Sequence, residues 1–292
     1  MYKAIAANKR NTVLIMAVFV GLITAIGWAV SLYYGDTGIT YWVLIGAALY
    51  ALIQYYAAGS LAVAMTGAQQ IEKRDNPRLY RTVENLSITL GIPMPKVYII
   101  NDPAPNAFAT GRNPQHAIVA ATTGLLDIMD DRELNAVMAH EMGHVQNYDI
   151  RVSMIAFGLV SAIGLLSDIV LRMMFYGGDR RENNTNPIVL VVGMVVIILA
   201  PIIAAIVQMA ISRQREYLAD ATGALTTRDS DGMVRALQKL KSNGRPMRKQ
   251  QSATAQLFIS NPLRPGFFAT LFSSHPPLDD RISRLQNNAE KF

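Results

Sequence analysis

Three long stretches without a charged side chain limit what this sequence can fold into. Residues 11–35, 37–71 and 183–212 contain no Asp, Glu, Lys or Arg. Each stretch exceeds the roughly 20 apolar residues that a helix needs to cross the hydrocarbon core of a bilayer. The segments between them have the composition of soluble protein, although 51% of the whole chain is hydrophobic. The sequence therefore predicts a membrane protein that carries a water-soluble part.

We expect four membrane-spanning helices arranged as two hairpins. In chain order, the expected spans are Thr12–Tyr34, Ile39–Ala58, Val152–Phe175 and Pro187–Ile211. The first hairpin would occupy residues 1–58 and the second residues 152–211. The third span is the weakest of the four, because it contains Asp168 and Arg172. These two side chains lie four residues apart on a helix, so they can pair with each other or reach the membrane surface.

The charges around the first hairpin predict its orientation. Lys3, Lys9 and Arg10 precede the first span, whereas the turn after it has no Lys or Arg, so the N-terminus should be cytosolic. An even number of crossings places both soluble segments, residues 59–151 and 212–292, on that same side. A signal peptide is the alternative for the first span, but the apolar run is too long and ends in aromatic residues typical of a membrane interface. The net charge of +6 suits a surface facing anionic lipid, and no basic helix or aromatic–basic motif indicates nucleic-acid binding.

The first soluble segment contains the motif His-Glu-x-x-His at residues 140–144. On a helix, His140 and His144 lie on one face and can bind the same ion, while Glu141 is close enough to hold a water on that ion. Two imidazoles and a carboxylate in this arrangement are the groups that zinc-dependent hydrolysis requires. The chain has no cysteine, so any further ligand must be a histidine or a carboxylate. The alternative is a pair of helical histidines without a metal.

A catalytic zinc takes three protein ligands and keeps one position open, so a third ligand is needed. Glu216 and Asp220 follow the fourth span and lie four residues apart on a predicted helix. We interpret Glu216 as the third ligand and Asp220 as the carboxylate that accepts the N–H of a ligand histidine and orients its ring. Glu133 and Asp149 compete for the third position, but both are too close to the histidines in sequence to bind from the opposite side. An exposed pair of helical acids without a metal is the remaining alternative.

Short β-prone segments precede the metal-binding helix and predict a small sheet. They are Lys96–Ile100, Ala107–Gly111 and Ala117–Ala121, and they follow a polar helix expected around Gln69–Leu90. An edge strand of such a sheet can hold a peptide substrate through main-chain hydrogen bonds. The alternative is a sheet without any role in substrate binding.

Helix-capping residues and an amphipathic pattern predict how the helices of the soluble part begin and where the chain ends. Asp130 or Asp131 should cap the helix that carries the motif, with Glu133 in its first turn. A C-terminal amphipathic helix is expected from Leu278 onward. His275 lies just before that helix, and spacing alone does not distinguish it from an ordinary loop histidine.

Taken together, these motifs resemble the HtpX family of membrane-embedded zinc metalloproteases and, more distantly, the CAAX prenyl proteases. The resemblance covers nearly the whole chain and rests on several independent motifs in the same order. Besides the N-terminal hairpin, the matching segments are Gly91-Ile-Pro-x-Pro-x-Val-Tyr98, Asn106-Ala-Phe-Ala-Thr-Gly111, His140-Glu-Met-Gly-His144, Glu216-Tyr-Leu-Ala-Asp220 and Ser274-His-Pro-Pro277.

The resemblance implies an α-helical membrane protein with four transmembrane helices and an α+β, zincin-like metalloprotease domain formed by the two soluble segments. It implies a zinc endopeptidase, with one zinc ion per chain, in the bacterial inner membrane. Its active site would face the cytosol, and its partners would be the lipid bilayer and misfolded membrane proteins that it degrades under stress. It also implies that Asn106, Ala107 and Phe108 border the substrate cleft and that His275 helps to stabilise the tetrahedral intermediate. Glu141 would act as the general base.

Two other functions are compatible with part of the sequence. A prenyl-protein protease of the CAAX type is one, but that family has more membrane spans enclosing a chamber than this chain can supply. The other is a four-span membrane scaffold or transporter with a structural metal. A transporter should show internally repeated halves, and a structural zinc should have a fourth side chain as ligand; the sequence offers neither.

Overall fold

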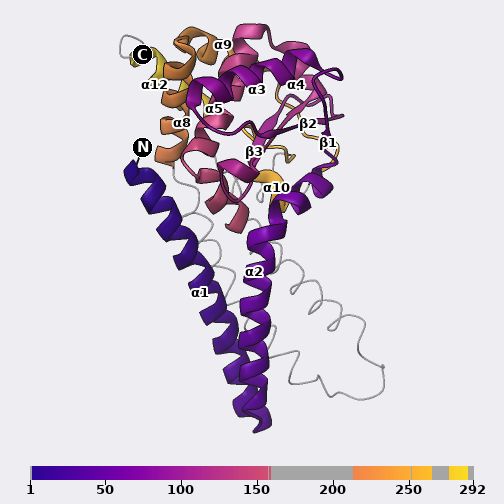
Figure 1. Ribbon diagram of the computed structural model, residues 1–292, viewed down its shortest axis with the longest axis vertical. Helices are drawn as coiled ribbons and strands as arrows, with labels where there is room; N and C mark the ends of the chain where they lie inside the picture. The colour runs from indigo at the N-terminus through magenta and orange to yellow at the C-terminus, as the bar shows by residue number, and fades with distance from the viewer. Residues whose placement is uncertain (1, 157, 159–212, 251, 265–275, 289–292) are drawn as a thin grey trace.

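The computed structural model describes residues 2–156, 158, 213–250, 252–264 and 276–288. It consists of a long helical hairpin and a mixed α/β body at one end of that hairpin (Figure 1). The expected fourth span and most of the expected third span, including Asp168 and Arg172, lie outside the described residues. His275 lies outside them as well.

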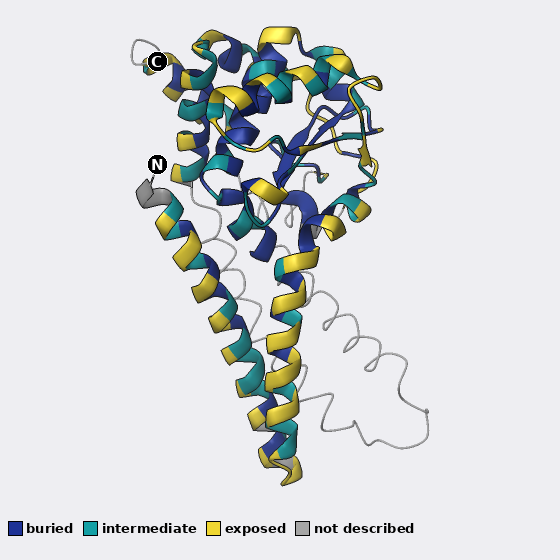
Figure 2. Ribbon diagram, in the orientation of Figure 1, coloured by how far each residue is buried: buried dark blue, intermediate teal, exposed yellow. Residues whose placement is uncertain are grey.

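The hairpin is formed by helices α1 (Tyr2–Tyr34) and α2 (Gly38–Thr66), which pack side by side (Figure 1). Gly35 has a left-handed φ of 69° and turns the chain between them. Within the part of the chain that the structure describes, these two helices are long and apolar enough to cross a membrane. Large apolar side chains cover their outer surfaces, for example Trp42 with 75% and Tyr41 with 66% of its surface exposed (Figure 2). Such a surface is suited to lipid and not to water.

Helix α2 continues past Ala58, where the sequence predicts the end of the second span, to Thr66. Residues 59–66 contain no charge and no proline, and Gly67 ends the helix in a left-handed conformation. The chain therefore enters the α/β body as a continuous helix and not through a loop.

The body contains one four-stranded sheet in the order β1-β2-β4-β3. The strands are β1 (Gln69–Gln70), β2 (Lys96–Ile100), β3 (Ala107–Thr110) and β4 (Ile118–Thr122). Strands β2 and β4 are parallel, and the other two pairs are antiparallel. The three predicted strands are thus confirmed to within a residue, and β3 lies at one edge of the sheet, beside the helix that carries the His-Glu-x-x-His motif.

The prediction of a polar helix around Gln69–Leu90 is wrong for the first part of that segment. Gln69 and Gln70 form strand β1, and helix α3 spans only Pro77–Leu90. The physical reason lies in Asn76 and Pro77, because a proline disfavours helical geometry in the residue before it. The Asn76 side chain instead accepts a hydrogen bond from the Leu79 N–H and caps the helix.

The remaining helices of the body include α5, which carries the His-Glu-x-x-His motif. They are η1 (Pro114–His116), α4 (Thr123–Ile128), α5 (Asp131–Gln146), α8 (Arg213–Thr227), α9 (Ser230–Asn243), α10 (Ser252–Ala255) and α12 (Leu278–Asn287). Helix α5 packs against α3, α8, α9 and strand β3. Its apolar side chains, among them Leu134, Val137 and Met142, are completely buried, and they form much of the core (Figure 2).

The N-terminus of α5 is closed by a capping box. The Asp130 side chain accepts from the Glu133 N–H, and the Glu133 carboxylate accepts from the Asp130 N–H. Of the two predicted caps, Asp130 is therefore the one used. Lys239 of α9 also binds the Glu133 carboxylate at 2.6 Å, which ties the start of the motif helix to its neighbour.

Gly124 lets the loop before strand β3 pack against the start of α4. Its N–H donates to the Asp102 carbonyl at 3.0 Å, and a Cβ at this position would collide with the backbone of Pro103. There is consequently no room for a side chain at residue 124.

We predict that Gly124→Ala lowers the free energy of unfolding by about 2 kcal/mol, because the added methyl group must push the backbone apart. Thermal melting of the detergent-purified protein measures the effect. Gly46→Ala is the matched control, since a Cβ at residue 46 would meet nothing within 4 Å. Equal melting temperatures for the two variants would contradict the prediction.

Candidate metal centre

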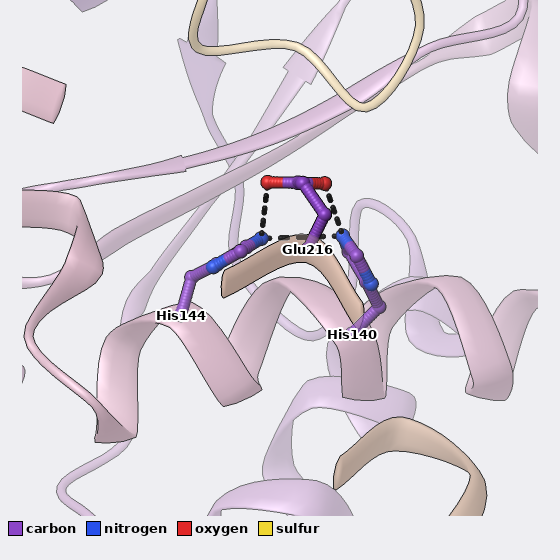
Figure 3. Close-up of side chains that lie close together, drawn as sticks. All are labelled: His140, His144 and Glu216. Carbon is purple, nitrogen blue, oxygen red and sulfur yellow. Dashed lines mark hydrogen bonds and ion pairs between the residues drawn. The ribbon is translucent and has the colours of Figure 1, made fainter. Parts of the chain in front are cut away.

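Close packing between helices α5 and α8 brings together the two segments that the sequence singled out. Gly223 of α8 lies against the backbone of α5, where a Cβ would approach the His140 nitrogen to 3.2 Å. Glu216 lies about two helical turns before Gly223, on the same face of α8. The missing side chain at Gly223 therefore lets Glu216 reach the two histidines (Figure 3).

The side-chain atoms of His140, His144 and Glu216 converge on one point. The Nε2 atoms of the two histidines are 3.2 Å apart. The Glu216 carboxylate oxygens lie 3.7 Å from Nε2 of His140 and 3.5 Å from Nε2 of His144. A tetrahedral zinc with bonds of about 2.0–2.1 Å separates its ligand atoms by roughly 3.3 Å. The three residues thus have the spacing and the N and O donors that could hold a metal ion.

In each histidine, a carboxylate lies within hydrogen-bonding distance of Nδ1. Nδ1 of His140 lies 2.9 Å from Asp220, and Nδ1 of His144 lies 3.0 Å from Asp149. An ionised carboxylate only accepts hydrogen bonds, so both Nδ1 atoms carry a proton. Nε2 of the neutral His140 ring then has a free lone pair for a metal, and Nε2 of His144 gains one when that ring gives up its second proton. Asp220 is placed as the sequence predicts. Asp149, which the sequence analysis considered only as a competing ligand, is in the position of a second orienting carboxylate.

Arg281 of α12 completes the buried network, and the sequence analysis did not identify it. It is fully buried, and its guanidinium binds both carboxylate oxygens of Asp220, at 2.6 and 2.8 Å. Burial alone would raise the pKa of Asp220, but Arg281 outweighs this effect and holds that pKa at about 2. Burial and the nearby Arg281 lower the pKa of His140 to about 4, so its imidazole is neutral at pH 7.

The buried acids around the three converging side chains outnumber the guanidinium groups, so the charge there favours a bound cation. Four buried acids face two guanidinium groups there; the acids are Glu141, Asp149, Glu216 and Asp220, and the bases are Arg215 and Arg281. Burial alone would lower the pKa of His144, but Glu216 and Asp149 raise it to about 9, so this ring holds a proton that a metal would displace. The surplus of negative charge suits a divalent cation.

Glu141 lies beside the converging side chains and is nearly completely buried, with 2% of its surface exposed. Burial raises its pKa to about 7, close to the value that suits proton transfer at neutral pH. A hydrogen bond to the backbone of Ala109 lowers the pKa to a smaller extent and links Glu141 to strand β3. The carboxylate is thereby fixed between the metal-binding residues and the edge of the sheet.

The predicted substrate residues Asn106, Ala107 and Phe108 are buried, with exposures of 3%, 0% and 0%. The Ala107 carbonyl accepts a hydrogen bond from the Ile259 N–H, so part of the outer edge of β3 is already paired. The Asn106 side chain binds the backbone of Ser260 in both directions. Contact between these three residues and a substrate stays a prediction.

Comparison with known proteins shows the family of this chain. The model of peptidase family M48 matches residues 73–289. The chain is 56% identical over 292 residues to the protease HtpX homolog of Tropheryma whipplei (strain Twist), with all of both chains covered. It is 44% identical over 296 residues to the protease HtpX homolog of Streptococcus gordonii, covering 98% of this chain and 99% of that relative. The crystal structure of S. mikatae Ste24p matches in fold, with a TM-score of 0.53 and 20% identity over 98% of this chain and 67% of that one.

The matched family region contains both segments of the candidate metal centre, and the relatives extend over the helical hairpin as well. The resemblance to the HtpX family expected from the motifs is thus confirmed. This chain belongs to peptidase family M48 and is a membrane metalloprotease.

Proposed function

We propose that this protein is a zinc-dependent endopeptidase of the bacterial inner membrane that cleaves misfolded or damaged membrane proteins. The observation that carries the proposal is the convergence of His140, His144 and Glu216 at tetrahedral spacing, with Glu141 beside them. Zinc bound there would lower the pKa of a water molecule and polarise the carbonyl of the peptide bond to be cleaved.

The chain's own residues would divide the remaining work. His140, His144 and Glu216 are the proposed ligands. Glu141 would take the proton of the attacking water and deliver it to the leaving amine, a transfer that suits a carboxyl group whose pKa is near 7.

Residues that contact the proposed ligands, or their partners, would keep those ligands in position. Asp220 and Asp149 would hold the two imidazoles in the tautomer that presents Nε2 to the metal. Arg281 would keep Asp220 ionised and stationary. His275 is proposed, from the family resemblance alone, to stabilise the tetrahedral intermediate.

The substrate would lie along strand β3. Glu141 binds the backbone of Ala109 in that strand, so a peptide beside β3 would pass close to the proposed base. At the end of the strand, Gly111 lies beside Gly59 of α2, where a Cβ on Gly59 would be 3.9 Å from the Gly111 Cα. This proximity of strand and membrane helix supports membrane proteins as the substrates.

The proposed topology has four spans, with the N-terminus and the active site on the cytoplasmic side. The segments 1–58 and 152–211 would form the two membrane hairpins, and 59–151 and 212–292 the two parts of the protease domain. The absence of Lys and Arg from the turn between α1 and α2 supports this orientation, since cationic flanks stay in the cytosol.

Purification in detergent tests the whole proposal. We expect one zinc ion per chain, and cleavage of casein or of a model membrane-protein substrate that stops when a chelator is added and resumes with zinc. Cleavage that persists after complete removal of metal would rule the mechanism out.

We predict that Glu141→Gln retains zinc but loses at least about 100-fold in turnover, because the amide cannot accept the water's proton. Metal analysis and peptide cleavage by the same preparation measure the two properties separately. A variant with wild-type turnover would refute Glu141 as the base.

Removal of Glu216 should affect the metal itself. We expect Glu216→Ala to lose its zinc during purification, because only two protein ligands remain. Glu72→Ala is the control, since Glu72 is an exposed carboxylate far from the histidines in sequence. One zinc per chain in the purified Glu216→Ala protein would mean that another residue is the ligand.

We predict that Arg281→Met lowers the free energy of unfolding by about 3 kcal/mol, because it leaves the buried Asp220 carboxylate without its cation. Combining it with Asp220→Leu should recover much of this loss, since the uncompensated charge is then removed. Arg284→Met on the exposed side of the same helix is the control. Equal melting temperatures for the Arg281 and Arg284 variants would show that the buried pair is not the cause.

A further inference from the structure

The turn that follows the metal-binding helix has an unusual backbone. Helix α5 ends at Gln146, and Tyr148 adopts a left-handed φ of 63°, which is unfavourable for a residue with a side chain. This turn separates α5 from the helical residues that begin at Asp149, and Oδ2 of Asp149 lies 3.0 Å from Nδ1 of His144. Some other contact must therefore hold the turn in place.

That contact comes from the membrane hairpin. Asn8 of α1 is buried, with 5% of its surface exposed, and its Nδ2 donates to the Asn147 carbonyl at 2.9 Å and to Oδ1 of Asp149 at 2.7 Å. One amide group thus binds the turn on both sides of Tyr148. Asn8 is separated from Asp149 by 141 positions in the sequence, so the contact belongs to the tertiary structure alone.

Neighbouring side chains reinforce the same junction. Lys9 of α1 lies with its Nζ 4.7 Å from the centre of the Tyr148 ring. The Arg151 guanidinium lies 5.1 Å from that ring and 5.6 Å from the ring of Tyr55 in α2. Helix α1 therefore contacts the turn directly, and α2 contacts Arg151, which packs on the Tyr148 ring of the turn.

Asn8 also determines which way the Asp149 carboxylate faces. One oxygen of Asp149 binds Asn8, and the other faces His144. Arg215 is a competing cation, with its Nη1 4.0 Å from the oxygen that Asn8 binds. Without the amide of Asn8, the carboxylate can rotate toward Arg215 and release the His144 ring.

We propose that Asn8 is a positioning residue: it acts through Asp149 to fix the orientation of His144, and so couples the first membrane helix to the metal centre. This inference rests on the proposed function, since it takes His144 to be a metal ligand. Displacement of α1 within the membrane would then alter metal binding at a site to which α1 contributes no ligand.

Metal affinity tests the inference directly. Full-length wild type, Asn8→Ala and Asn8→Asp are purified in detergent, stripped of metal and titrated with zinc in the presence of a competing chelator. Asn8→Asp keeps the shape of the side chain but replaces the N–H donor with an oxygen that repels Asp149. Asn11→Ala is the matched control, because Asn11 is half-buried on the same helix.

We expect both Asn8 variants to bind zinc about ten-fold more weakly than wild type, the lower end of the effect of outer-shell partners, and Asn11→Ala to bind it normally. The visible absorption spectrum of the cobalt-substituted protein should also change in the Asn8 variants, since it reports ligand geometry. A merely structural role would lower the melting temperature of the metal-free protein and leave zinc affinity and the cobalt spectrum at wild-type values, which would overturn the inference. If wild type itself takes up no zinc, the proposed function fails together with it.

Discussion

The contact between helices α5 and α8 is the constraint on which the rest of the structure depends. Gly223 presents no side chain to α5, so the backbones of the two helices lie close together at His140. The helical repeat then places Glu216 and Asp220 on the same side of α8 as Gly223. Backbone geometry thereby determines the positions of a proposed ligand and of the carboxylate behind another ligand.

Such a concentration of buried charge is unfavourable unless each group has a partner. The Asp220 carboxylate is compensated by Arg281 with two short hydrogen bonds, and the arrangement is fully enclosed. Buried pairs of this kind contribute little net stability, because the loss of hydration offsets their attraction. Their value here is orientation, since the pair holds an imidazole in one tautomer. The remaining negative charge near Glu141 and Glu216 is what makes the site receptive to a dication.

Both helices of the membrane hairpin contact the α/β body, so the hairpin is not a separate anchor. Helix α2 runs without interruption to Thr66 and passes directly into strand β1, while α1 reaches the turn after the metal-binding helix through Asn8. The sheet edge at Gly111 lies beside α2. In the proposed function, this arrangement would place the cleavage site near the membrane hairpin.

The sequence by itself determined the features that depend on local periodicity. Helical spacing placed His140 and His144 on one face, β-prone runs located three strands, and the charge-free stretches located the helical hairpin. Local signals also selected Glu216 as the third converging residue, because it was paired with Asp220 at helical spacing. The helix expected from Gln69 begins instead at Pro77, because the Asn76–Pro77 pair starts a helix there.

Only the tertiary structure decided that Asp149, Arg281 and Asn8 support the converging side chains. No sequence pattern distinguishes Asp149, Arg281 and Asn8 from exposed polar residues or from residues on the packed face of a helix. Their partners lie in other segments of the chain. The pairing of the β3 edge with Ile259 is of the same kind. Periodicity reports the face on which a residue lies, whereas packing between helices and strands far apart in the chain determines what that face meets.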